Sequence, residues 1–427
     1  MALTLRQNFL WTSLGNVVYG GFQWGIIIIL CKLGNPEMVG HYALGVSICA
    51  PIFMFAGLNL RLVQATDVNH DYTFNHYLGL RLITSSLALA AVFLIVALLG
   101  YRFLLGAVIL LVGIFKLLEA LSETIYGFLQ RIEQMDFIGI SLTLKSLLSL
   151  LAFAAALALT HRLVWAVLGL AAASALTFIC YDTHRCRRMM AAAVPAPAGY
   201  RVGASWVKTL RPAWEWAVQL QLVKLSLPLG VAGMLIALTF NIPRYFIKYY
   251  LGAAELGIYS AMFQLMLAGS ILMMAVGQTI QPRLARYYAC RDLGAFCRLL
   301  FRGATVAALA GLAGWLFSLL WGKPILTIFY HQEYARHTAC LQWVMASSIF
   351  YYLATILIFG VTAMRSFKNL LLPFAASAAA AGLSSWLLIP AFGLMGAAWA
   401  LCIINLSNTV FLGLLIVFLF RQAARQT

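Results

Sequence analysis

Three charged residues lie inside an otherwise apolar run of the chain, from Phe103 to Ile125. Lys116, Glu119 and Glu123 are spaced i, i+3 and i+7, which places them on one face of a helix. In lipid, each charge at mid-depth would cost roughly 3 kcal/mol, so such residues normally face a bundle interior or a water-filled cavity. The stripe therefore indicates either a structural ion network between helices or a functional face, which lines a transport path or changes protonation during the transport cycle.

Further cations lie within apolar runs or at their ends, and they suit an anionic substrate. Arginine binds phosphate oxygens through a planar fork of donors, and lysine acts as a point charge. Taken singly, each of these cations is also explained by snorkelling to the membrane interface or by topology. Arg244 is the strongest candidate after the stripe, because it follows Pro243, where a broken helix would aim it inward. The remaining candidates are Lys248, Arg61, Arg81, Lys145 and Arg302.

Prolines, cysteines and short motifs indicate which hinges, metal sites, redox sites and nucleotide-binding sites the chain can contain. Pro51, Pro228 and Pro243 are candidate hinges, because proline removes a helix hydrogen bond. None of the 8 cysteines has metal-ligand or CxxC spacing, so we expect no metal site and no redox site. The chain has no GxxxxGK[ST] phosphate-binding motif, which argues against ATP-driven export by this chain alone. We expect no cofactor, and coupling to protons or to sodium ions stays open.

The composition is that of a polytopic membrane protein. Hydrophobic residues make up 63% of the chain and charged residues 10%, whereas soluble domains carry about 25% charged residues. The mean hydropathy is +0.92. The net charge of +17 does not indicate nucleic acid, because the cations fall between the apolar runs, as a topological signal would.

Apolar runs long enough to cross a membrane predict about 12 transmembrane helices and an all-α integral membrane fold. Most cations lie at the two termini and in the even-numbered loops, so both termini are predicted to be cytoplasmic. The predicted spans are 9–30, 40–60, 80–100, 103–125, 141–160, 163–182, 225–248, 257–280, 300–321, 340–362, 370–390 and 395–420.

The longest polar interruption divides these spans into six and six. We expect an N-terminal six-helix lobe over 1–182, a cytoplasmic amphipathic linker over 183–224 and a C-terminal six-helix lobe over 225–427. Within the linker, Ser205 to Leu222 combines tryptophans with cations and is a candidate for an amphipathic helix on the inner leaflet, although an ordinary interlobe linker anchored by interfacial Trp and Arg explains it more simply.

The two halves share a sequence pattern after their first spans. Leu33 to Tyr42 and Leu251 to Tyr259 both read Leu-Gly, then Glu, then Gly, then Tyr, if one insertion is allowed. Both halves begin with an outward helix, so they are predicted to be parallel repeats about an axis along the membrane normal. Two six-helix lobes with a central cavity follow.

The order of several motifs along the spans resembles the Wzx-type polysaccharide flippases of the multidrug/oligosaccharidyl-lipid/polysaccharide superfamily, over about residues 5–420. The motifs are the two Leu-Gly turns, Pro51, Tyr126-Gly127-Phe128-Leu129-Gln130-Arg131, Pro228-Leu229-Gly230, Asn241-Ile242-Pro243-Arg244-Tyr245 and the turn Gly393–Ala398.

The resemblance implies translocation of an undecaprenyl-diphosphate-linked oligosaccharide repeat unit from the cytoplasmic to the periplasmic leaflet. The product would enter O-antigen, capsule or a related surface polysaccharide. The implied location is the bacterial inner membrane, and the implied partners are the lipid-linked substrate, membrane lipids, a polysaccharide polymerase and a chain-length regulator, with no nucleic acid.

Three other functions stay open from the sequence. A cation-coupled multidrug antiporter would need carboxylates in its core, whereas spans one and seven contain no Asp or Glu. A lipid II flippase normally has fourteen spans and cations in its first helix. An integral-membrane polysaccharide polymerase would be an enzyme, and such enzymes tend to have a large external loop or clustered external acids.

Overall fold

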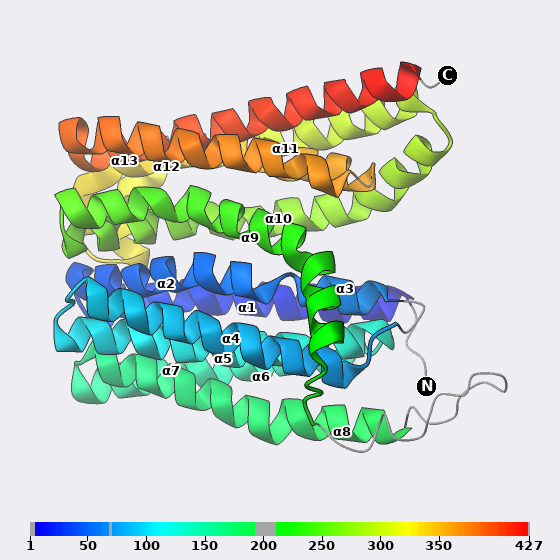
Figure 1. Cartoon of the computed structure of the whole chain (residues 1–427). Coiled ribbons are helices and arrows are strands. Elements are labelled where there is room, and N and C mark those ends of the chain that lie inside the picture. Colours follow the sequence, from blue (N-terminus) through cyan, green and yellow to red (C-terminus); the bar gives the residue numbers. More distant parts are fainter. Residues whose placement is uncertain (1–4, 68–70, 193–210, 365, 426–427) are drawn as a thin grey trace. The chain divides into compact units, whose positions relative to one another are not determined.

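The computed structural model describes residues 5–67, 71–192, 211–364 and 366–425, and these residues form helices without any strand. The first half of the described chain is a series of long helices joined by short turns (Figure 1). Its elements are α1 Leu5–Leu33, α2 Pro36–Gly57, α3 Leu60–Thr66, α4 Phe74–Leu98, α5 Phe103–Arg131, α6 Met135–Thr160, α7 Leu163–Thr177, the π-helical turn η1 Phe178–Asp182 and α8 Thr183–Ala192.

The second half contains longer helices. Its elements are α9 Trp216–Tyr250, α10 Ala253–Ala289, α11 Leu293–Phe329, η2 Tyr334–His337, α12 Thr338–Ala363, η3 Phe367–Leu370 and α13 Leu371–Arg425. The last helix is 55 residues long but contains a non-helical residue, Gly393, at φ 59° and ψ −135°. A side chain would be strained at this positive φ, so glycine is the residue that permits the break.

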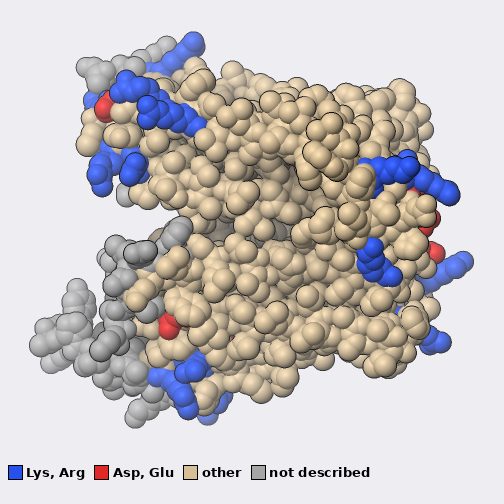
Figure 2. Space-filling view, turned by 180° about the vertical axis from the view of Figure 1, so that it is seen from behind, with Lys and Arg blue, Asp and Glu red and all other residues tan. Residues whose placement is uncertain are grey.

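Eleven helices among the described residues are long and apolar enough to cross a membrane. The break at Gly393 divides the last of them into two segments, and it falls between the predicted spans 370–390 and 395–420. The prediction of about 12 membrane spans is therefore confirmed. Figure 2 shows how charge is distributed on one face of the protein. Lys and Arg gather towards two opposite ends, and the surface between them carries few charges.

The chain divides into two compact units by its internal contacts. Unit 1 comprises Met1–Ile26 and Ile48–Met234, and unit 2 comprises Ile27–Ser47 and Leu235–Thr427. This division cuts through α1, α2 and α9, whereas the predicted lobes follow whole spans along the sequence. The lobe boundaries at 182 and 225 therefore stay predictions.

The predicted amphipathic linker is partly outside the described residues, because these stop at 192 and resume at 211. Residues 211–215 have no regular structure, and Trp216 to Leu222 form the first turns of α9 rather than a separate helix. Pro228 lies in the first half of α9, and Figure 1 shows that this helix is not straight along its length. Proline is a common cause of such bends, so Pro228 keeps its place as a candidate hinge.

Candidate functional site

The predicted stripe on α5 begins with a close ion pair in unit 1. The Nζ atom of Lys116 lies 2.6 Å from Oε2 of Glu119, and both side chains are mostly buried. The hydroxyl of Tyr19, on α1, donates to Oε1 of the same carboxylate. The sequence predicted the pair from its i, i+3 spacing but not the tyrosine. These contacts join α1 to α5 through a charged group, as the structural reading of the stripe requires.

Glu123 does not join this network by any hydrogen bond to the described residues, although it shares the stripe. Its side chain is exposed on α5, within electrostatic range of Arg81. Arg81, on α4, is only 2% exposed, and its Nε donates to Oγ1 of Thr124 at 3.2 Å. The stripe thus contains one enclosed carboxylate and one exposed carboxylate, of which only Glu123 is open to a solute.

A second charged cluster is enclosed between α5, α6 and η1. Nζ of Lys145 donates to Oγ of Ser122 at 2.6 Å and lies 3.6 Å from the carboxylate of Asp182. That carboxylate also accepts hydrogen bonds from the hydroxyls of Ser122 and Ser141. Lys145 and Asp182 are 2% and 1% exposed. The predicted candidate Lys145 is therefore enclosed, and a contact with substrate would require this cluster to open.

Tyr126 connects this buried cluster with the predicted candidate Arg61. The guanidinium of Arg61 lies over the Tyr126 ring at 5.6 Å, and the Lys145 ammonium lies 5.5 Å from the same ring. Nε of Arg61 also donates to Oε1 of Gln130 at 3.1 Å. The segment Tyr126–Arg131, which supported the family resemblance, is therefore the place where cations from α3 and α6 meet α5.

In unit 2, Arg244 on α9 is held by neutral groups among the described residues. Its Nη1 donates to Oδ1 of Asn241 at 3.2 Å and to Oγ of Ser47 at 3.4 Å. Its guanidinium carbon lies 4.8 Å from the centre of the Phe263 ring. Within the described residues no carboxylate pairs with it. The guanidinium therefore occupies a half-buried site without an anionic partner among the described residues.

Two polar atoms at this site are buried and lack hydrogen-bonding partners among the described residues. They are Nε of Arg244 and the hydroxyl of Tyr259. Tyr259 is 0% exposed, and it lies close enough to Arg244 for an electrostatic interaction. A buried donor without an acceptor costs about 1–3 kcal/mol. An anion with several oxygen acceptors would satisfy both donors if the site opened to admit it, so the chemistry of the donors fits a phosphate or a carboxylate.

The other predicted residues of unit 2 do not gather at Arg244. Lys248 is half-buried one turn further along α9, within electrostatic range of His41. Arg302 is exposed on α11. The predicted helix break at Pro243 is wrong, because α9 continues through it to Tyr250. A single proline removes one helix hydrogen bond, and the remaining bonds maintain the helix on both sides.

Asp182 and Tyr259 are the candidate residues that sequence reasoning missed. Asp182 ends the sixth span, and the signal for it was the unpaired Lys145 in a neighbouring apolar run. Tyr259 belonged to the repeated Leu-Gly motif and was treated there only as a marker of duplication. Among the described residues, no group of three or more His, Cys, Asp or Glu could hold a metal ion.

Comparison with known proteins shows which family the chain belongs to. The pattern of the family described as polysaccharide biosynthesis protein matches residues 5–288. The chain is also 26% identical over 404 residues to the capsular polysaccharide biosynthesis protein CapF of Staphylococcus aureus, which covers 93% of this chain and 95% of that protein.

Solved structures resemble the fold of the whole chain. An inward-facing multidrug resistance MATE family transporter of the MOP superfamily has a TM-score of 0.67 at 13% identity, covering 100% of this chain and 96% of the other. A MOP superfamily transporter from Pyrococcus furiosus, described as having a binding pocket of reverse polarity, has a TM-score of 0.66 at 12% identity, covering 96% and 94%. The chain therefore belongs to the polysaccharide biosynthesis protein family, in agreement with the resemblance drawn from the sequence, and it is a multi-pass membrane protein with the fold of the MATE transporters.

Proposed function

We propose that this transporter moves an undecaprenyl-diphosphate-linked oligosaccharide from the cytoplasmic to the periplasmic leaflet of the bacterial inner membrane. The product would serve the synthesis of a surface polysaccharide such as capsule or O-antigen, where a polymerase would take it over. Both termini would be cytoplasmic, as the distribution of cations between the loops predicts. The capsule-related description of the Staphylococcus aureus relative supports a role in this class of pathway.

The observation that carries the proposal is the arginine without a carboxylate partner. Arg244 and the buried hydroxyl of Tyr259 offer donors that nothing in the described chain satisfies. A diphosphate presents several charged oxygens and can accept from a guanidinium fork and a phenol at once. The helix that carries Arg244 also contains no Asp or Glu. This chemistry favours an anionic headgroup over the cationic drugs that a multidrug antiporter would carry.

Alternating access would then carry the headgroup across the membrane. The diphosphate would be held by cations, the sugars by polar groups of a hydrated path, and the polyprenyl tail would stay in lipid. Pro51, on α2, and Pro228 and Pro243, on α9, are the positions at which we place bending during the cycle. The Lys116–Glu119 pair and the exposed Glu123 are the groups that we assign to coupling with protons or sodium ions.

Deletion of the gene tests the proposal in the source bacterium. We expect the deletion to abolish the surface polymer and to cause complete, unexported lipid-linked repeat units to accumulate, and restoration of the gene to reverse both. If repeat units never form, or if they are exported but stay unpolymerised, the flippase function is wrong and an enzymatic role replaces it. Normal surface polymer with increased drug sensitivity would favour the antiporter instead.

A further inference from the structure

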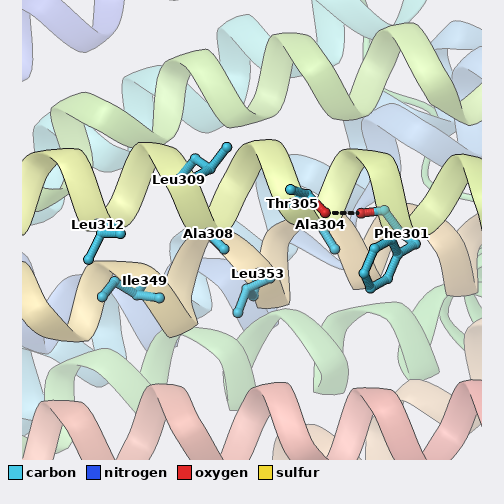
Figure 3. A pocket seen from close by; sticks show the side chains of 8 residues that line it. All are labelled: Phe301, Ala304, Thr305, Ala308, Leu309, Leu312, Ile349 and Leu353. Atoms are coloured by element: carbon cyan, nitrogen blue, oxygen red, sulfur yellow. Dashed lines mark hydrogen bonds between the residues drawn. The ribbon is translucent and has the colours of Figure 1, made fainter.

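A continuous apolar groove runs along one face of α11 in unit 2. Two adjoining hollows of about 390 and 480 Å³ share Phe301 and Ala304 on their lining. The small side chains of Ala304 and Ala308 form its floor, and Ile349 and Leu353 of α12 form one wall, as Figure 3 shows. The groove exists because alanines recur at i and i+4 between larger residues on the same helix face.

One end of this groove is cationic. Arg298 lines it there, together with Ile416 and Phe420 from the end of α13. Arg302 lies one helical turn further along α11, and both arginines are exposed. The three helices that form the groove, α11, α12 and α13, contain no Asp or Glu. The nearby carboxylate is that of Asp292, which caps the start of α11 by accepting from a backbone N–H. Two arginines outweigh this single carboxylate, so the charge at this end favours an anion, and the remainder of the groove favours hydrocarbon.

The length of the groove fits a single acyl chain. From Cys297 to Leu312 the lining extends over 15 helical steps of α11, or about 22 Å at the helical rise of 1.5 Å per residue. Half of the hydrocarbon core of a bilayer is about 15 Å thick. A chain that begins at the headgroup level of one leaflet would thus fill the groove to near the membrane centre. A polyprenyl carrier, with its many methyl branches and much greater length, fits less well.

The geometry points to a binding site for an anionic glycerophospholipid, with its phosphate at Arg298 and Arg302 and one acyl chain over Ala304 and Ala308. This site is separate from the Arg244 arrangement, and it does not depend on the transported substrate. A bound lipid here would fill the space between α11 and the end of α13, which already meet through the rings of Phe296 and Phe420 at 5.4 Å.

Native mass spectrometry of the purified full-length protein tests this site with two probe lipids of identical acyl chains, phosphatidylglycerol and phosphatidylcholine. We expect the wild type to retain phosphatidylglycerol at least roughly five-fold better, as the contribution of about one surface cation implies. Arg298→Gln should lose the preference, and Ala308→Trp should lose most binding of both lipids. Val306→Trp is the matched control, because Val306 is exposed on α11 but does not line the groove.

Three outcomes would overturn the inference. Equal retention of the two lipids by the wild type would show that the site does not select an anionic headgroup. Equal lipid binding by Ala308→Trp and Val306→Trp would show that the lipid does not bind in the groove. Displacement of phosphatidylglycerol by an equimolar amount of undecaprenyl phosphate would assign the groove to the carrier lipid. If Ala308→Trp fails to fold, Arg298→Gln at its exposed position still decides the result.

Discussion

Gly40 and Gly257 occupy equivalent positions in the two repeats, and each packs against the first residue of the other's helix. Gly40 is the fifth residue of α2, which begins at Pro36, and Gly257 is the fifth residue of α10, which begins at Ala253. A Cβ atom at Gly40 would overlap the carbonyl oxygen of Ala253, and one at Gly257 would overlap that of Pro36. This reciprocal contact lies within unit 2, and it agrees with the duplication that the repeated motif predicts.

Alanine at either glycine should therefore destabilise the crossing. We expect Gly40→Ala and Gly257→Ala each to cost about 1–3 kcal/mol through overpacking, seen as a lower unfolding temperature in detergent. Gly413→Ala is the control, because a Cβ there meets nothing within 4 Å. Alanine favours a helix by up to about 1 kcal/mol over glycine, so the control should be unchanged or more stable. Equal stability of all three variants would contradict the close contact.

The buried pair of Lys145 and Asp182 should be sensitive to removal of one partner. Lys145→Met leaves the buried carboxylate of Asp182 without a cationic partner, although Ser122 and Ser141 still donate to it, and breaking a buried ion pair in this way costs about 3–5 kcal/mol. The double variant Lys145→Met/Asp182→Leu should recover most of the loss, because no unpaired charge stays buried. Thermal unfolding and abundance in the membrane measure both effects. A single variant as stable as the wild type would show that the pair is not enclosed as described.

The two carboxylates of the α5 stripe should behave differently. Glu123→Gln changes an exposed group, so we expect several-fold slower translocation with normal abundance in the membrane. Glu119→Gln removes the negative charge that pairs with Lys116, although the amide oxygen can still accept from Tyr19, so abundance and thermal stability should fall as well. Comparison of transport per molecule with abundance separates the two effects. Full translocation activity in Glu123→Gln would remove this residue from the transport path.

Tyr259→Phe gives effects of opposite sign on stability and transport. Its hydroxyl is buried without a partner among the described residues, so its removal should stabilise the empty protein by about 1–3 kcal/mol. The same change removes a donor for the substrate anion and should weaken substrate binding by several-fold or more. Unfolding temperature with and without substrate measures both. A variant that is stabilised but transports normally would exclude Tyr259 from the anion site.

The sequence predicted the membrane spans well because a membrane helix needs about 20 apolar residues, a signal that lies in the local composition. The helix ends were less predictable. For example, α11 begins at Leu293 and ends at Phe329, whereas the predicted span was 300–321. Helical hydrogen bonds continue into polar turns beyond the hydrocarbon layer, where hydropathy gives no signal.

Contacts within the candidate sites could be predicted from the sequence only where the two interacting side chains lie on the same helix. Lys116 and Glu119 are neighbours by spacing, so their ion pair followed from the sequence. Lys145 and Asp182 are brought together by the packing of α6 against the π-helical turn after α7, and no spacing rule reports such a contact. The same holds for Arg244 and Tyr259, which lie on different helices.

Translocation by the purified protein in vesicles shows whether Arg244 binds the diphosphate during transfer. An undecaprenyl-diphosphate oligosaccharide would be placed in one leaflet, and its arrival in the other leaflet would be followed by the accessibility of its sugars to an added glycosidase. We expect the wild type and Arg286→Gln, an exposed arginine of the same unit, to accelerate transfer equally. Arg244→Gln should slow transfer by about tenfold or more, since a charge-assisted hydrogen bond contributes about 1.5–3 kcal/mol. Equal rates for Arg244→Gln and the wild type would show that Arg244 does not bind the substrate anion during translocation.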